Sequence, residues 1–144
     1  MSERVLRDIL GDNKPVSVDG GSNVVEATRI MMRTDAGAVL VMNGSKLEGI
    51  FTERDLVKRV VGAGLDPKSS AVADVMTAHI QTADPEMKAV DALKTMQENG
   101  FRHLPVKENN KILGVISLRD FIGKELTEIQ DQQAVERSWA ESNR

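Results

Sequence analysis

The sequence GIFTERD at residues 49–55 returns in altered form as GVISLRD at residues 114–120. Each stretch has a glycine, two apolar residues, a threonine or serine, one variable residue, and then arginine and aspartate. The spacing of 114 − 49 = 65 residues holds upstream without a gap, because VVEA at residues 24–27 is matched by AVDA at residues 89–92. A match of this length in the same order indicates an internal duplication of the chain.

Each copy predicts the order strand, helix, strand, strand, helix, so the expected fold class is α/β (α+β) with two β-α-β-β-α repeats. The first strands are expected at residues 16–18 and 80–82. Further upstream the spacing changes, since Asp8 and Asp74 are 66 residues apart, and one small insertion separates the two beginnings. We therefore predict one module with approximate two-fold internal symmetry.

Apolar residues at positions i, i+3, i+4 and i+7 predict an amphipathic helix from about Val24 in the first copy and Ala89 in the second. The expected helix N-caps are Ser22 in the first copy and Asp84, followed by Pro85, in the second. These positions fix where each predicted helix begins.

A hairpin is predicted after each of these helices. Asn43-Gly44 stands between two apolar runs, and both residue types tolerate positive φ, which two-residue hairpin turns require. Residues 108–110 (Glu-Asn-Asn) hold the same place in the second copy and predict a weaker form of the turn.

The predicted boundaries are a first repeat over residues 4–62, a linker over 63–71, a second repeat over 72–126 and a helical tail over 127–144. One repeat of this size buries too little surface to be more than marginally stable alone. We therefore expect the two repeats to pack together.

The repeated motif has two interpretations. Thr52-x-x-Asp55 and Ser117-x-x-Asp120 both have the form of a capping box, and capping alone is the commoner meaning of such a pattern. Alternatively, the amides at a helix start suit a phosphate, and the carboxylate can accept both hydroxyls of a ribose diol. Arg54 or Arg119 adds a guanidinium to each motif, as a phosphate ligand or as a solvated side chain.

The composition restricts the possible partners. The chain has 19 Lys and Arg against 22 Asp and Glu, a net charge of −3, and no cysteine. This balance gives no electrostatic basis for binding nucleic acid or a membrane surface, and disulfides and thiolate chemistry are excluded. No cluster of His, Asp and Glu has metal-ligand spacing. The charged N-terminus and the lack of a bilayer-length apolar run predict a cytoplasmic protein.

With these motifs the chain resembles paired cystathionine-β-synthase-type (CBS) domains. The resemblance covers about residues 4–126, and DVM at residues 74–76 and RHLPV at residues 102–106 add to it. It implies a module with two related clefts that bind AMP, ADP, ATP, NAD or S-adenosylmethionine. Family pairs commonly associate through their helices, which implies a homodimer. Many members regulate an enzyme or channel, so a separate regulated partner protein is expected here.

The resemblance also implies residue roles. Asp55 and Asp120 would hold the ribose, and Thr52 and Ser117 would lie near phosphate. Residues near Val16 and Ile80 would contact the adenine. Two further phosphate candidates, Arg102 and His103, stand at the start of a predicted strand, where an ordinary strand role is the alternative.

Three hypotheses follow, of which the first is a regulatory module or sensor that binds an adenosine nucleotide. The second is a structural dimerisation module in which both aspartates only cap helices. The third is an enzyme, which the sequence disfavours because it offers no nucleophile, paired carboxylates or Ser/His arrangement. An S-adenosylmethionine sensor is a less favoured form of the first.

Overall fold

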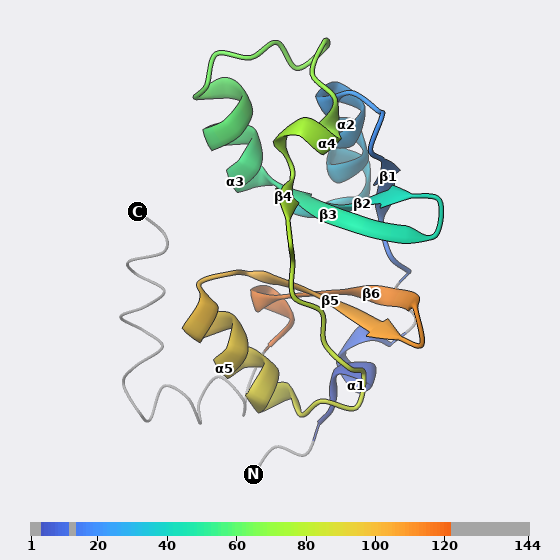
Figure 1. The fold of residues 1–144 in the computed structure, drawn as a ribbon. Helices are drawn as coiled ribbons and strands as arrows, with labels where there is room; N and C mark the ends of the chain where they lie inside the picture. Colours follow the sequence, from blue (N-terminus) through green and yellow to red (C-terminus); the bar gives the residue numbers. More distant parts are fainter. Residues whose placement is uncertain (1–3, 12–13, 122–144) are drawn as a thin grey trace. The chain divides into compact units, whose positions relative to one another are not determined.

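The computed structural model describes residues 4–11 and 14–121 of the 144-residue chain (Figure 1). Two compact units divide the chain. Pro15–Ile80 forms one, here called the first-repeat unit, and Met1–Lys14 with Gln81–Arg144 forms the other, called the second-repeat unit. The helical tail predicted over residues 127–144 lies outside the described residues.

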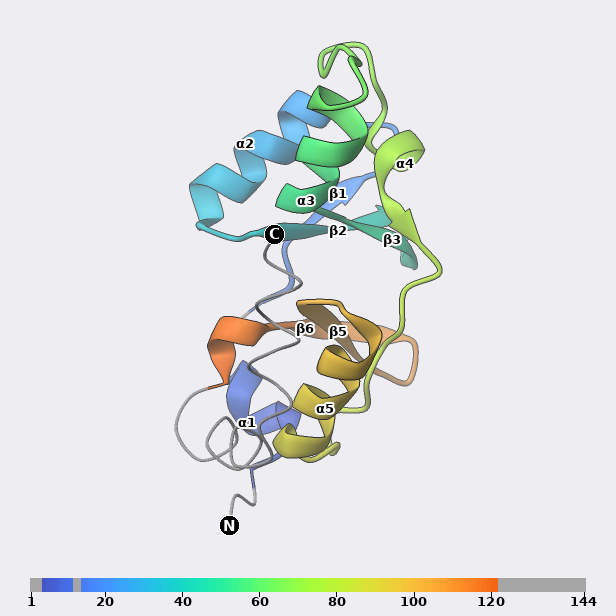
Figure 2. The ribbon, with the colours of Figure 1, turned by 90° about the vertical axis from the view of Figure 1, so that its left-hand side faces the viewer.

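The first-repeat unit contains a four-stranded sheet in the order β1-β2-β3-β4. Its strands are β1 (Ser17–Asp19), β2 (Ala38–Asn43), β3 (Lys46–Thr52) and β4 (Thr77–Ala78). β1 runs parallel to β2, and the other neighbours are antiparallel. Its helices are α2 (Val24–Thr34), α3 (Glu53–Asp55), the π-helix η1 (Leu56–Val61) and α4 (Val72–Val75). In Figures 1 and 2, α2, α3 and α4 lie on one face of the sheet.

The amphipathic face predicted for α2 is confirmed, because Val24, Ala27 and Met31 are buried in the core of this unit. The predicted cap is wrong by one residue. Asn23, not Ser22, is the N-cap, and its side chain accepts a hydrogen bond from the backbone N–H of Glu26 at 2.9 Å. Asparagine and serine cap equally well, so residue type alone did not separate the two.

The second-repeat unit contains the helices α1 (Leu6–Leu10) and α5 (Ala89–Asn99), the hairpin of β5 (His103–Glu108) and β6 (Lys111–Ser117), and the 3₁₀-helix η2 (Leu118–Asp120). The strand predicted at residues 80–82 is wrong. Only Ala83 bridges Val106, in parallel, through N–H···O bonds of 2.9 Å on each side. The bridge keeps the duplication, since it matches the pairing of Val18 with Val41 in the other unit.

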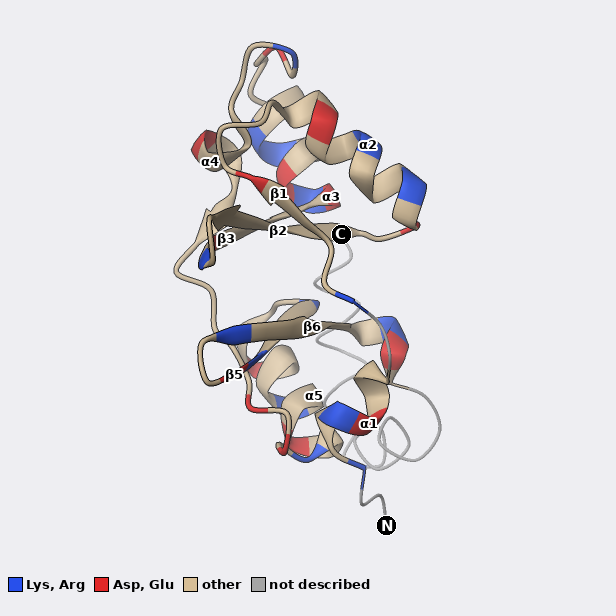
Figure 3. Ribbon diagram, turned by 90° about the vertical axis from the view of Figure 1, so that its right-hand side faces the viewer, with Lys and Arg blue, Asp and Glu red and all other residues tan. Residues whose placement is uncertain are grey.

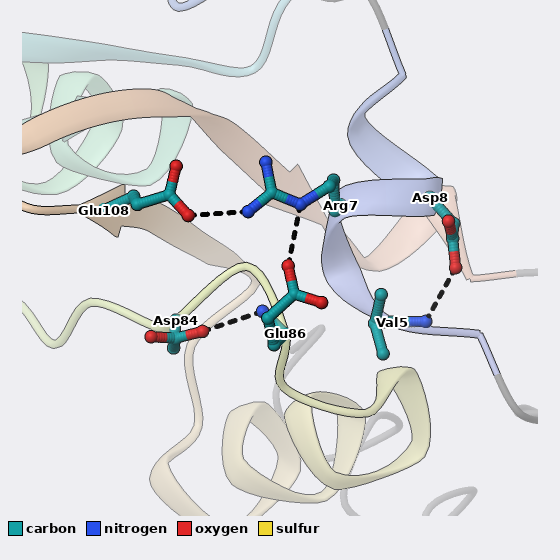
Figure 4. Close-up of polar contacts among 6 residues, drawn as sticks. All are labelled: Val5, Arg7, Asp8, Asp84, Glu86 and Glu108. Atoms are coloured by element: carbon teal, nitrogen blue, oxygen red, sulfur yellow. Dashed lines mark hydrogen bonds and ion pairs between the residues drawn. The ribbon is translucent and has the colours of Figure 1, made fainter.

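The cap predicted for α5 is also wrong. The helix begins at Ala89 with Lys88 as its N-cap, four residues beyond Asp84. The carboxylate of Asp84 instead accepts a hydrogen bond from the N–H of Glu86 at 2.8 Å, which makes a local turn before the helix (Figure 4). Aspartate followed by proline favours such turns as readily as it favours helix starts.

Both predicted hairpins are confirmed. In the second-repeat unit, Asn109 and Asn110 form the two-residue turn with φ of 49° and 71°, as this turn requires. In the first-repeat unit Asn43 pairs with Lys46, so the turn is Gly44-Ser45, and Gly44 has φ of 62°. The turn predicted as the weaker one is therefore the one with positive φ at both positions.

The leading helix of each repeat belongs to the other repeat's compact unit. α1 packs in the second-repeat unit, where Leu6 and Leu10 join the core. Arg7 bonds Glu86 at 2.7 Å and Glu108 at 2.6 Å (Figure 4), and these two hydrogen bonds raise the pKa of its guanidinium. Conversely, α4 and β4 complete the first-repeat unit.

Candidate functional site

Each copy of the motif stands where a hairpin strand passes into a helix. Thr52 is the last residue of β3 and the N-cap of α3. Ser117 is the last residue of β6 and the N-cap of η2. The backbone N–H of the hydroxyl residue donates to the aspartate in both copies, at 3.0 Å from Thr52 to Asp55 and at 2.7 Å from Ser117 to Asp120. The capping interpretation of the motif is therefore correct at both positions.

Asp55 is a buried carboxylate with partners at both oxygens. Its Oδ2 accepts from the N–H of Thr52 at 3.0 Å and from the Thr52 hydroxyl at 3.1 Å. Its Oδ1 accepts from the Thr77 hydroxyl at 2.9 Å and lies 3.5 Å from Nε of Arg59. The side chain is 7% exposed. A charge buried to this degree is stable only with such compensation.

The glycine of the motif brings the chain of Thr77 close enough for this contact. Gly49 pairs with Ala78, and a Cβ added at Gly49 would lie 2.6 Å from the Thr77 carbonyl oxygen and 2.6 Å from Sδ of Met76. The glycine also follows a register shift in the hairpin at Val41. Both roles considered for this glycine, close backbone approach and a neighbouring bulge, are thus present.

Asp120 has fewer partners than Asp55. Its Oδ2 accepts from the N–H of Ser117 at 2.7 Å and from the Ser117 hydroxyl at 3.2 Å. The described residues supply no donor to its Oδ1. The residue is partly exposed. One carboxylate oxygen of this copy can therefore accept bonds from another molecule.

The structure brings most of the second-copy candidates together. His103 pairs directly with Ser117 across the β5–β6 hairpin, which places their side chains on one face of the ribbon. Arg102 comes just before β5, and its carbonyl accepts a hydrogen bond from the N–H of Leu118 at 3.0 Å. Arg119 is exposed on η2. Three cationic or titratable side chains thus stand in sequence or in register beside Ser117.

The first-copy candidates are less concentrated. Arg54 is exposed on α3. Positions 37 and 38, which correspond to Arg102 and His103, hold glycine and alanine. Lys and Arg alternate with Asp and Glu along α2 and α3, so these helices present no basic surface (Figure 3).

The two adenine candidates lie at the edges of β-structure in the first-repeat unit. Val16 immediately precedes β1, and its carbonyl accepts from the N–H of Leu40 at 2.9 Å. Ile80 follows β4 and lies in no strand, so its predicted place on a first strand is wrong. Both residues are partly buried.

Sequence reasoning missed Thr77 and Arg59, which hold the Asp55 carboxylate. Residues 76–78 were expected in a loop, whereas Thr77 and Ala78 form β4. Arg59 stands one helical turn after Asp55, and this i, i+4 spacing was the available signal for their ion pair. The Thr77 contact spans 22 residues and had no local signal.

Neither a metal site nor a membrane span is found in the described parts of the chain. Residues 4–11 and 14–121 include no group of three or more His, Asp or Glu that could hold a metal ion. Their helices are also too short or too polar to cross a bilayer.

Comparison with known proteins identifies the family of this fold. The model of the CBS domain matches the chain twice, at residues 6–62 and 72–126. The chain belongs to the CBS-domain family. A CBS-domain protein from Burkholderia ambifaria has the same fold, with a TM-score of 0.79 and 28% identity over 90% of this chain and 96% of that one. The resemblance drawn from the repeated motif is therefore confirmed.

Further relatives show how widely the CBS pair occurs. The meiotically up-regulated gene 70 protein of Schizosaccharomyces pombe is 42% identical over 115 residues, which are 79% of this chain but 16% of that protein. The chain thus spans about one sixth of that relative's length. A CBS domain protein of Pyrobaculum aerophilum, complexed with AMP, has the same fold with a TM-score of 0.76 and 21% identity over 91% of this chain and 100% of that one.

Proposed function

We propose that this chain is a regulatory or sensor module that binds an adenosine nucleotide of the AMP, ADP, ATP or NAD class. The observation that carries the proposal is the partly exposed Asp120, whose Oδ1 can accept from a ribose hydroxyl while Oδ2 stays bonded to Ser117. Hydrogen bonds to a charged acceptor contribute about 1.5–3 kcal/mol each, enough to make ribose binding specific.

The surroundings of Ser117 support the phosphate part of the proposal. Arg102, His103 and Arg119 lie next to it in sequence or across the hairpin. Guanidinium groups bind phosphate oxygens in a fork geometry, so a cluster of this kind suits a charged nucleotide better than free adenosine. The AMP complex of the Pyrobaculum relative adds support at the level of the fold.

A second candidate is a structural module without a ligand. The buried Asp55 favours it, because every contact of that carboxylate is made inside its own unit. If Asp120 acts in the same way, the motif serves only to cap helices in both copies. Binding experiments separate the two candidates.

The test is isothermal titration of the pure chain with AMP, ADP, ATP, NAD and S-adenosylmethionine, with inosine monophosphate as a base control. At least one adenosine nucleotide should bind and raise the melting temperature, because a ligand at 100 times its Kd stabilises the folded state by about 2.7 kcal/mol. The bound nucleotide should be recovered intact after incubation with Mg²⁺, since binding alone lowers no chemical barrier. Binding by none of the panel would favour the structural candidate, and sustained turnover would make the protein an enzyme.

As a regulatory module, the chain would act on a separate protein, and we propose a homodimer in the cytoplasm as its working form. Exposed apolar side chains on the first-repeat unit support association: Met32 is 74% exposed, Val57 63% and Val61 68%. The Burkholderia relative, which is assigned to signal transduction, supports a regulatory role.

A further inference from the structure

The two carboxylates of the repeated motif differ in how many hydrogen bonds they can still accept. An ionised carboxylate has about four acceptor positions. At Asp55, donors lie at both oxygens: the N–H and hydroxyl of Thr52, the hydroxyl of Thr77, and Nε of Arg59 at 3.5 Å. A ribose cis-diol brings two more donors, and Asp55 has no acceptor position left for them.

Access to Asp55 is restricted as well. Its side chain is only 7% exposed, and β4, which carries Thr77, is hydrogen-bonded to β3 at Gly49 and Ile50. Because no Cβ separates Gly49 from the chain of Thr77, the two strands approach closely. A nucleotide could reach this carboxylate only after Thr77 had moved, which would leave a buried charge with fewer partners.

The corresponding position in the other unit has no such side chain. The spacing of 66 residues that relates Asp8 to Asp74 also relates Gly11 to Thr77. Glycine has no hydroxyl, and the only donors that the described residues give to Asp120 are the N–H and hydroxyl of Ser117. About two of its four acceptor positions remain for a ligand.

A second difference is independent of the carboxylates. The residue opposite the motif hydroxyl across the hairpin is His103 for Ser117 but Ala38 for Thr52. The residue before it is Arg102 in one copy and Gly37 in the other. Groups that can donate hydrogen bonds to a phosphate thus accompany Asp120 and are missing at the same positions beside Asp55.

We infer that Thr77 closes the first copy of the motif, so that the chain binds one nucleotide, at Asp120, and keeps Asp55 as an internal structural carboxylate. This inference rests on the proposed function and decides which of the two motifs carries it. Thr77 is a specificity-determining residue in this scheme, because its hydroxyl takes the acceptor position that a ribose would use.

The first experiment titrates AMP into the wild type and into Asp120→Asn. The wild type should bind one AMP per chain. The amide of Asp120→Asn can still accept from Ser117 but has lost the second carboxylate oxygen, so AMP affinity should fall roughly 10–100-fold with no second site remaining. A site of wild-type affinity in Asp120→Asn, or two AMP per chain in the wild type, would overturn the inference while leaving the proposed function intact.

The second experiment compares Thr77→Val with Thr77→Ser. Valine keeps the shape of threonine without its hydroxyl, whereas serine keeps the hydroxyl. Thr77→Val should lower the melting temperature and leave AMP affinity at Asp120 within about twofold, and Thr77→Ser should resemble the wild type in both. If Thr77→Val weakens AMP binding as strongly as Asp120→Asn does, Thr77 is a ligand contact and the inference is wrong. Absence of AMP binding by the wild type and every variant would refute the inference together with AMP as the proposed ligand.

Discussion

Single atoms decide the difference between the two motifs, which are nearly identical in sequence. Thr52 and Ser117 both bond the aspartate three residues later, but only Asp55 also meets a hydroxyl from another strand. That contact depends on Gly49, whose missing side chain lets the backbone of Thr77 come close. A glycine that looks like a local turn signal in the sequence therefore sets a tertiary hydrogen bond.

Gly49→Ala tests this role. The new Cβ would lie 2.6 Å from the Thr77 carbonyl oxygen, so β3 and β4 must separate, at a cost of about 1–3 kcal/mol in the free energy of unfolding. Urea denaturation followed by circular dichroism measures this loss. Gly44→Ala is the control, since a Cβ there meets nothing within 4 Å and only the positive φ of 62° is strained. Equal stability of Gly49→Ala and the wild type would show that the close approach is not required.

At the scale of elements, the exchange of leading helices distinguishes the compact units from the sequence repeats. α1 precedes the first repeat in the chain, yet Leu6 and Leu10 lie in the core of the second-repeat unit. Its backbone is fixed there too, by bonds from the N–H of Leu6 to the carbonyl of Met87 at 3.0 Å and from that of Arg7 to Pro85 at 2.9 Å. A helix of five residues is not stable alone, so these contacts hold it in place.

Leu6→Ala should therefore destabilise the second-repeat unit. The side chain is fully buried, and such a truncation costs about 2–5 kcal/mol. The volume-conserving control Leu6→Met should cost less than about 1.5 kcal/mol. Hydrogen exchange would locate the loss, with faster exchange expected in α5 and β6 than in the strands of the first-repeat unit. Unchanged protection in α5 would mean that α1 is dispensable.

At the scale of the whole molecule, the surface of the first-repeat unit bears on association. Val57 and Val61 are four residues apart on η1, and both are more than half exposed. Scattered apolar side chains are ordinary on protein surfaces, but neighbouring ones favour contact with another protein surface.

We expect the double variant Val57→Glu, Val61→Glu to shift the chain from dimer to monomer in sedimentation velocity. Two carboxylates would have to lose their hydration in the interface, which exceeds the gain from the small apolar area that they replace. Lys58→Glu, an exposed residue of the same helix, is the control for a change of charge alone. A wild type that is already monomeric at micromolar concentration would contradict the proposed homodimer.

The duplicated motif, the two hairpins and the helix faces could be predicted from the sequence, because each depends on residues that are near one another in the chain. Turn residues prescribe local φ, and helical periodicity marks the buried face. The CBS family and the capping of both helices were predicted on the same basis. The weaker predictions, the caps at Ser22 and Asp84 and the strand at residues 80–82, lie where several local patterns compete.

The tertiary structure alone decided where the leading helices belong and which aspartate can accept a ligand. The partners of Asp55 include a residue 22 positions away, brought close by the pairing of β4 with β3. Asp120, in the same motif, has no equivalent partner among the described residues. Hydrogen-bond capacity is spent by whichever donors the fold brings within about 3 Å, and a repeated sequence cannot show how two copies differ when the donors come from outside the repeat.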